Sequence, residues 1–282
     1  MYSAKFINND NGYTFDFTLE NNVIFDIDPL SELDIDIGAA QSYDQIGETV
    51  ESQAIKGITR EIRGVLLGEA NNRKGTLLRA FAPRTHGRLT FNDEYYVDCY
   101  IKKTPAISVQ PENAKFSLMV FCPYPYWSHV DEISQKLNVY QKAFSFPVAY
   151  ASHVFGTRVT GGFISVYNEG TAPAYFTIEF IASATVQNYG ILNVTTNKYI
   201  QINDEISVGD TVRVYREYGR IYAQKTTSGV TTDVLSSFDI GSKFYTLATG
   251  ENILKLYAST NENNLGALIS FRNVYTGVYD GM

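Results

Sequence analysis

Cysteine and tryptophan are scarce in this chain, whose 282 residues contain two cysteines, Cys99 and Cys122, and one tryptophan, Trp127. Two cysteines cannot build the disulfide framework of small secreted domains, and a pair without a nearby histidine is not a zinc site. We therefore expect both cysteines to be buried, reduced thiols inside strands.

Long apolar runs are also missing. No run approaches the length that crosses a bilayer, and the first ten residues lack the apolar segment of a signal peptide. We expect a chain that is made in a cytoplasm and is not inserted into a membrane. Its net charge of −7 argues against a nucleic-acid partner.

Motifs that carry catalysis or bind cofactors are absent as well. The histidines, His86, His129 and His153, show no metal-ligand spacing, and there is no nucleophile elbow, phosphate loop or dinucleotide fingerprint. Acidic residues are plentiful enough for a glycosidase pair, but most are isolated positions in alternating strands, which is typical of a solvated face. We predict a protein that is not an enzyme and has no catalytic, metal or cofactor-binding residues.

Tyrosine and phenylalanine are abundant, at 21 and 17 residues, and favour β-structure. The residues from Phe116 to Cys122 alternate with apolar side chains on both faces, which predicts a strand covered on both sides. Pro123 and Pro125 then end the strand. We interpret this stretch as the exit from a first domain, residues 1–128, and expect Trp127 to be buried at the domain junction.

The first domain is predicted to be a mostly antiparallel, sandwich-like β domain with one helix. Its expected strands are short and separated by turn residues. The apolar stripe that includes Leu77 and Phe81, ended by Pro83, predicts a helix at 69–81. The expected strands cover 13–19, 23–27, 33–37, 58–68, 88–91, 95–101 and 116–122.

The sign of the charge reverses inside this domain. Residues 1–55 hold eleven acidic residues against one base, whereas residues 56–88 hold eight bases against two acids. Opposite charges of this kind can meet between subunits and set their register. Our hypothesis places Arg79, Arg84 and Arg88 in an oligomer interface; the alternative is that the charges neutralise each other within one subunit.

A polar segment at 129–146 is predicted to be a linker or arm, and residues 147–282 a second domain. There the pattern is one of short strands with regular turns, without helical periodicity, which favours a β-sandwich or jelly roll. Twelve tyrosines in this half could stack on sugars, so a lectin-like, carbohydrate-binding module is a second interpretation. The alternative is that these tyrosines are core and strand-face residues.

Several motifs in order resemble the distal tail proteins of phages with long, non-contractile tails, the Dit family, in its short form without extra carbohydrate-binding modules. The matching segments are 60–68, 77–83 with 87–91, 122–127, 166–173, 191–197, 209–210 and 250–253.

This resemblance implies a virion structural protein at the distal end of the tail. The N-terminal domain would assemble into a homo-hexameric ring, and the C-terminal domain would be a galectin-like sandwich. Such a ring joins the major tail tube protein to the tail-tip protein and, in many phages, anchors receptor-binding proteins during host attachment. The resemblance supplies no catalytic residues and no cofactor.

Overall fold

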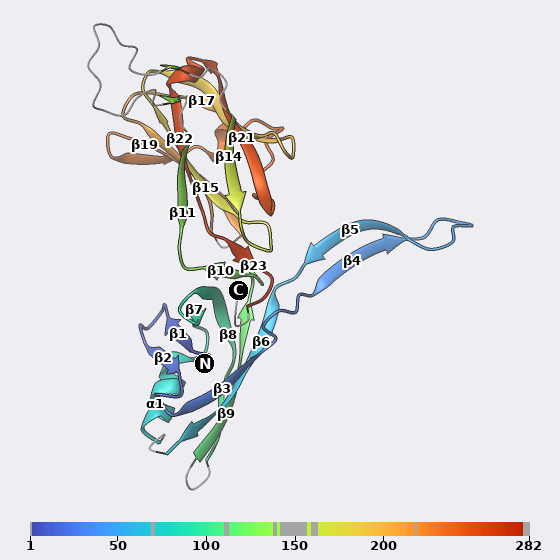
Figure 1. Ribbon diagram of the computed structural model, residues 1–282, viewed down its shortest axis with the longest axis vertical. Coiled ribbons are helices and arrows are strands. Elements are labelled where there is room, and N and C mark those ends of the chain that lie inside the picture. Colours follow the sequence, from blue (N-terminus) through green and yellow to red (C-terminus); the bar gives the residue numbers. More distant parts are fainter. Residues whose placement is uncertain are drawn as a thin grey trace. The chain divides into compact units, whose positions relative to one another are not determined.

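The computed structural model describes residues 2–68, 71–109, 113–137, 140–141, 157–158, 163–217 and 219–278. They belong to two compact units: unit 1 runs to Asp131 and resumes at Val274, and unit 2 is Glu132–Asn273. Strands dominate both units, and α1 (Asn71–Ala80) is the one α-helix among the described residues (Figure 1). The prediction of a mainly β protein with a single helix is confirmed.

Unit 1 is built on one antiparallel sheet. Seven strands follow one another in the order β2-β1-β7-β8-β9-β6-β3, and β10 pairs with both β8 and β23. The strands of the unit are β1 (Ala4–Asn8), β2 (Thr14–Phe17), β3 (Val23–Asp28), β4 (Ile35–Ala40), β5 (Thr49–Ile55), β6 (Ile58–Leu67), β7 (His86–Phe91), β8 (Tyr95–Val109), β9 (Asn113–Cys122), β10 (Trp127–His129) and β23 (Val274–Tyr275).

Strand β9 lies near the middle of this sheet and shows how its core forms. The residues of one face are buried, and they meet the buried residues Val97 and Cys99 of β8 in one core cluster. The opposite face is only partly covered, and Phe121 is exposed. The expectation that β9 is covered on both sides is therefore wrong for this chain, because the single helix covers one face only.

Helix α1 covers the buried face of the sheet through Leu77, which is inaccessible to solvent. Phe81 follows the helix and stacks on Phe6 of β1 with ring centroids 4.2 Å apart. The helix ends one residue before the predicted end, and the predicted start at 69 lies outside the described residues. Gly75 lies within it rather than ending it.

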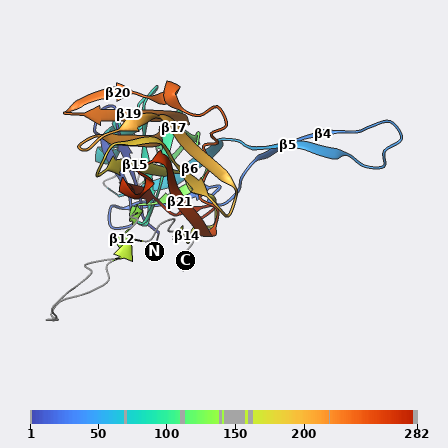
Figure 2. The same cartoon turned by 90° about the horizontal axis from the view of Figure 1, so that it is seen from above.

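Strands β4 and β5 form a separate two-stranded sheet, which we call the arm (residues 35–55). Both views show the arm projecting away from the nine-stranded sheet of unit 1 (Figure 1 and Figure 2). Every residue of β5 is exposed, and β4 is exposed except at Gly38. The arm therefore contributes almost nothing to the core of this chain.

Unit 2 is a β-sandwich made of a six-stranded sheet, β11-β22-β15-β18-β19-β20, and a four-stranded sheet, β14-β21-β16-β17. Its elements are β11 (Ile133–Leu137), β12 (Tyr140–Gln141), β13 (Thr157–Arg158), β14 (Phe163–Asn168), β15 (Phe176–Ala182), β16 (Val186–Asn193), β17 (Lys198–Ile206), β18 (Thr211–Glu217), β19 (Arg220–Thr227), β20 (Val230–Asp233), β21 (Gly250–Thr260) and β22 (Leu265–Phe271), with 3₁₀ turns η1 (Leu235–Ser237) and η2 (Glu262–Asn264).

The two sheets of unit 2 meet through buried aromatic and aliphatic side chains. Phe180 of β15 and Tyr189 of β16 are both inaccessible to solvent and pack edge to face, with centroids 5.3 Å apart. Strand β17 runs without a break from Lys198 to Ile206.

The limits of the two units differ in detail from the predicted segments 1–128, 129–146 and 147–282. Ile133–Leu137, expected in the linker, is strand β11 and pairs with β22 of unit 2. Val274 and Tyr275, expected in the second domain, form β23 and pair with β10 of unit 1. The rest of the predicted linker lies largely outside the described residues, so the three-segment division stays a prediction.

Candidate assembly surfaces and a candidate pocket

The arm carries apolar side chains that nothing in this chain covers. Ile35 and Ile37 of β4 are 50% and 57% exposed, and Tyr43 and Ile46 in the connecting turn are fully exposed. A soluble monomer rarely presents such a group of apolar side chains on one projecting element, and such patches mark interaction sites. The arm is therefore the strongest candidate for a protein-protein contact.

The arm is also acidic. Four carboxylates lie on β4 and β5 or between them, and a fifth directly precedes β4. Among the described residues, the one ion pair that these carboxylates form joins Asp36 to Lys56, with 3.3 Å between Oδ2 and Nζ. Both partners are more than half exposed, so this pair contributes little to stability. The acidic residues are Asp34, Asp36, Asp44, Glu48 and Glu51. A partner that fits the arm would present apolar pockets and positive charge.

The end of helix α1 is held in place by Asn8, a buried residue of β1. Its Nδ2 donates to the carbonyl oxygen of Ala80 at 2.7 Å and to Thr85 Oγ1 at 2.8 Å. Its Oδ1 accepts from the backbone amides of Asp10 and Asn11. These bonds fix the segment that carries Arg79 and Arg84.

Arg79, Arg84 and Arg88 differ in their surroundings. Arg79 lies over the ring of Tyr13 at 5.7 Å, and Arg84 follows the helix in a left-handed turn with φ of 63°. Both are exposed, and within the described part of the chain neither forms an ion pair.

Arg88 is engaged within its own chain. Its Nε and one terminal nitrogen donate to the Asp98 carboxylate at 2.8 and 3.0 Å, and its guanidinium lies 3.8 Å from the centre of the Tyr96 ring. For Arg88, the arrangement favours neutralisation within the subunit. The interface role of the three arginines stays a prediction.

Trp127 is buried in the core of unit 1. Its Nε1 donates to the carbonyl oxygen of Leu30 at 2.9 Å, and the guanidinium of Arg60 lies 4.8 Å from the ring centre. Burial of the indole was expected; a role of Trp127 at the domain junction stays a prediction.

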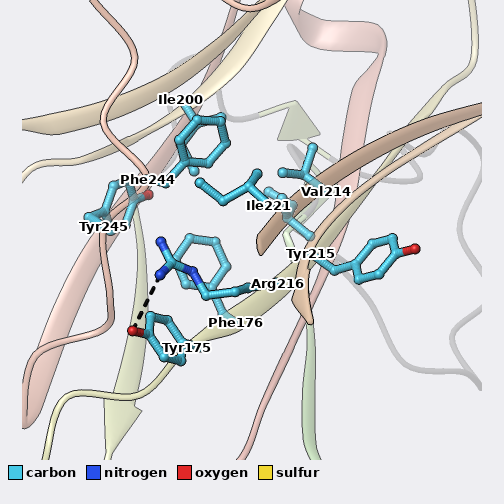
Figure 3. A pocket seen from close by; sticks show the side chains of 10 residues that line it. Tyr175, Phe176, Ile200, Val214, Tyr215, Arg216, Ile221, Phe244 and Tyr245 are labelled. Carbon is cyan, nitrogen blue, oxygen red and sulfur yellow. Dashed lines mark hydrogen bonds between the residues drawn. The ribbon is translucent and has the colours of Figure 1, made fainter. Parts of the chain in front are cut away.

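Unit 2 contains a small pocket lined by aromatic side chains of β15, β18 and the segment before β21 (Figure 3). Arg216 lies over the ring of Tyr175 at 4.4 Å and donates to its hydroxyl at 3.4 Å. The hydroxyl of Tyr245, another lining residue, is buried without a hydrogen-bond partner among the described residues, and burial raises its pKa.

The size of this pocket limits what it can hold. The volume open to the centre of a water-sized sphere is about 20 Å³. One water needs about 10–15 Å³ by the same measure, so the pocket accommodates roughly one water molecule and not a sugar ring. A larger ligand would have to bind across the surface, for example on the stacked rings of Tyr215 and Tyr222, whose centroids are 5.2 Å apart.

Within the described ranges, no group of three or more histidine, cysteine, aspartate or glutamate side chains could hold a metal ion. None of the helices described is long and apolar enough to span a membrane.

A family model, described as the C-terminal domain of a siphovirus-type tail component, matches residues 169–275. Most of unit 2 lies within this range. The resemblance to distal tail proteins is thus confirmed, although no match was found among curated protein sequences.

Solved structures extend the likeness to nearly the whole chain. The Dit protein of phage SPP1, described as a paradigm of the hub adsorption apparatus in phages that infect Gram-positive bacteria, aligns with a TM-score of 0.66 and 14% identity, over 96% of this chain and 98% of that one. A chain of the phage P2 baseplate in its activated, calcium-containing conformation aligns at 0.50 and 13% identity, over 99% and 100%. At such identities the likeness shows a shared fold.

The sequence analysis missed the arm as a functional element. Its first strand was predicted from the alternation in residues 33–37 and was treated like the buried strands before it. Alternation alone does not set the arm apart, because the exposure of a strand depends on the fold of the whole chain.

Proposed function

We propose that this protein is a distal tail protein: six copies form a ring at the end of a phage tail, between the tail tube protein and the tail-tip protein, and the ring helps to anchor receptor-binding proteins. Unit 1 forms the ring, and unit 2 is a galectin-like sandwich. The role is structural, and no residue is assigned to catalysis. The observation that carries this proposal is the exposed arm, in a chain whose residues 169–275 match the C-terminal domain of a siphovirus-type tail component.

A closed ring requires two different surfaces of one subunit to meet head to tail. The arm supplies one surface, with Ile37, Tyr43 and Ile46 exposed and with several carboxylates that form no ion pair among the described residues. The end of helix α1 is the candidate for the other, because Arg79 and Arg84 are exposed and form no ion pair in the described part of the chain. In this arrangement apolar burial holds the subunits together, and the charges set register and speed of association.

Solution mass tests the ring. We expect the purified chain to show a species of six times its own mass by light scattering, and a ring in negative-stain images. The double variant Tyr43→Ser, Ile46→Ser at the tip of the arm should be a folded monomer with an unchanged melting temperature.

Ile240→Ser is the matched control, because Ile240 is a fully exposed apolar residue of unit 2. It should assemble like the natural chain. A natural chain that remains monomeric at high concentration would refute the ring, and tip variants that still form the ring would refute the role of the arm.

Saccharide binding is a second candidate function, favoured by one observation. Arg213 lies over the ring of Tyr215 at 4.9 Å, and Tyr215 stacks on Tyr222 across β18 and β19. Titration calorimetry with neutral and acidic saccharides would test it, with Tyr222→Ala as the variant that should lose binding. Because Trp127 is buried in unit 1, its fluorescence should not respond to a sugar bound on unit 2.

A further inference from the structure

Cys99 and Cys122 lie on adjacent strands near the middle of the unit 1 sheet. In the register of β8 and β9, Tyr100 is opposite Phe121 and Ile101 is opposite Val120. The same register, continued by one residue, sets Cys99 opposite Cys122. Both are free cysteines, 1% and 0% exposed, and both belong to the same core cluster.

This placement satisfies the geometry of a disulfide. Residues directly opposite each other in an antiparallel pair have Cα atoms about 4.5 or 5.5 Å apart, depending on the type of pair. A disulfide joins Cα atoms about 4.4–6.8 Å apart. The two cysteines can therefore be joined without moving either strand.

The two thiols are chemically unequal. Their mutual interaction lowers the pKa of Cys122 and raises that of Cys99, and the positive charge of Arg60 lowers the pKa of Cys122 further. Burial opposes ionisation at both sulfurs. Because the thiolate is the reactive form of cysteine, this direction favours Cys122 as the attacking sulfur and Cys99 as the resolving thiol.

Arg60 is fixed in this position by its other contacts. It is fully buried; its guanidinium donates to the carbonyl oxygens of Pro29 and Pro125 and lies against the ring of Trp127. Its Nε has no hydrogen-bond partner in the described part of the chain. A buried guanidinium held in this way keeps a permanent positive charge beside the thiol pair.

We propose that Cys99 and Cys122 are a site of oxidative modification, at which a small peroxide converts the thiol pair into a disulfide that joins β8 to β9. The Cys122 thiolate attacks one peroxide oxygen, the O–O bond breaks, and hydroxide leaves, so that Cys122 becomes a sulfenic acid. The Cys99 sulfur then attacks the Cys122 sulfur, and the S–O bond breaks.

The hydroxyl group released from the Cys122 sulfur takes the proton of the Cys99 thiol and leaves as water. The hydroxide formed in the first step takes the proton that the Cys122 thiol lost when it ionised, and becomes a second water molecule. Two electrons from the thiol pair thus reduce one peroxide to two water molecules. A small oxidant is required because neither sulfur is open to solvent. The resulting disulfide constrains the unfolded chain and so raises the thermal stability of unit 1. This inference does not depend on the proposed function.

The test is oxidation of the folded, full-length chain with hydrogen peroxide, followed by digestion without reductant and mass spectrometry. We expect a peptide containing Cys99 linked to one containing Cys122 within one chain, and an upward shift of the unit 1 melting temperature that a reductant reverses. Cys99→Ala should accumulate a sulfenic acid at Cys122, which a dione reagent traps. Cys122→Ala should react at Cys99 at least tenfold more slowly.

The double variant Cys99→Ala, Cys122→Ala is the control for oxidation of methionine, and peroxide should leave its melting temperature unchanged. Two free thiols after peroxide treatment, a bridge between chains, or sulfenic acid forming first at Cys99 would each overturn the proposal. If a variant fails to fold, the linked peptides of the natural chain decide the question.

Discussion

Strands β3 and β4 follow one another in unit 1 and have the same alternation of apolar and acidic residues, yet they differ in environment. In β3, Ile27 is 4% exposed and pairs with Ile62 of β6. In β4, Ile37 is 57% exposed and pairs only with β5 of the arm. Alternation therefore predicts that a segment is a strand. Whether that strand is buried depends on which distant residues pair with it and cover it.

The largest expected effect on stability distinguishes substitutions at Ile27 from those at Ile37. Ile27→Asp places an unpaired carboxylate in the core, so the free energy of unfolding of unit 1 should fall by about 3 kcal/mol or more. Ile37→Asp should change it by about 0.5 kcal/mol at most, because the side chain is already in water. Denaturant unfolding measures both.

In the ring we propose, Ile37→Asp should instead prevent assembly, which light scattering detects. A large loss of monomer stability in Ile37→Asp would contradict the view that the arm lies outside the core.

An effect of intermediate size on stability should distinguish Gly64, on β6, from Gly38, on the arm. A Cβ at Gly64 would lie 2.4 Å from the backbone oxygen of Ile24 on β3 and against the ring of Phe116, so Gly64→Ala should cost about 1–3 kcal/mol. A Cβ at Gly38 on the arm would meet only the Ser52 hydroxyl, which can rotate away. Gly38→Ala should leave the melting temperature unchanged, and equal losses in both variants would break the comparison.

The smallest effect on stability is expected from the arginines. Arg88→Glu breaks an exposed pair with Asp98 and should lower the free energy of unfolding by about 1 kcal/mol or less. Arg79→Glu with Arg84→Glu should lower the free energy of unfolding by about 1 kcal/mol or less, through the contact of Arg79 with Tyr13 and its place in the last turn of α1, and should slow ring assembly, most clearly at low salt.

Asp44→Lys with Glu48→Lys on the arm should restore the assembly rate of the Arg79→Glu, Arg84→Glu variant if the two surfaces meet. Arg213→Glu, on an exposed position of unit 2, is the control. Loss of thermal stability in the Arg79, Arg84 variant without a change in assembly would support neutralisation within one subunit.

Local patterns predicted the elements well. The helix was found from Leu77, Phe81 and Pro83, and the buried face of β9 from its alternation. The open face of β9 was missed, because Met119 and Phe121 are apolar and the sequence does not reveal that only one helix covers the sheet.

The sites were harder to predict than the elements. That Cys99 and Cys122 are buried followed from their strands, but that they are opposite each other depends on the register of β8 with β9. The pairing of Arg88 with Asp98 likewise depends on the hairpin register. The arm could not be distinguished from a core strand, because exposure is a property of the whole fold.

The return of the chain to β23 has a consequence for synthesis. Val274 and Tyr275 complete a sheet whose other strands are made before residue 130, and Val278 is buried in the same core. At about 5–20 residues per second, translation of residues 132–273 takes roughly 7 to 30 s. During that time the nascent N-terminal unit lacks its final strand, so its folding is completed only when the ribosome reaches the end of unit 2.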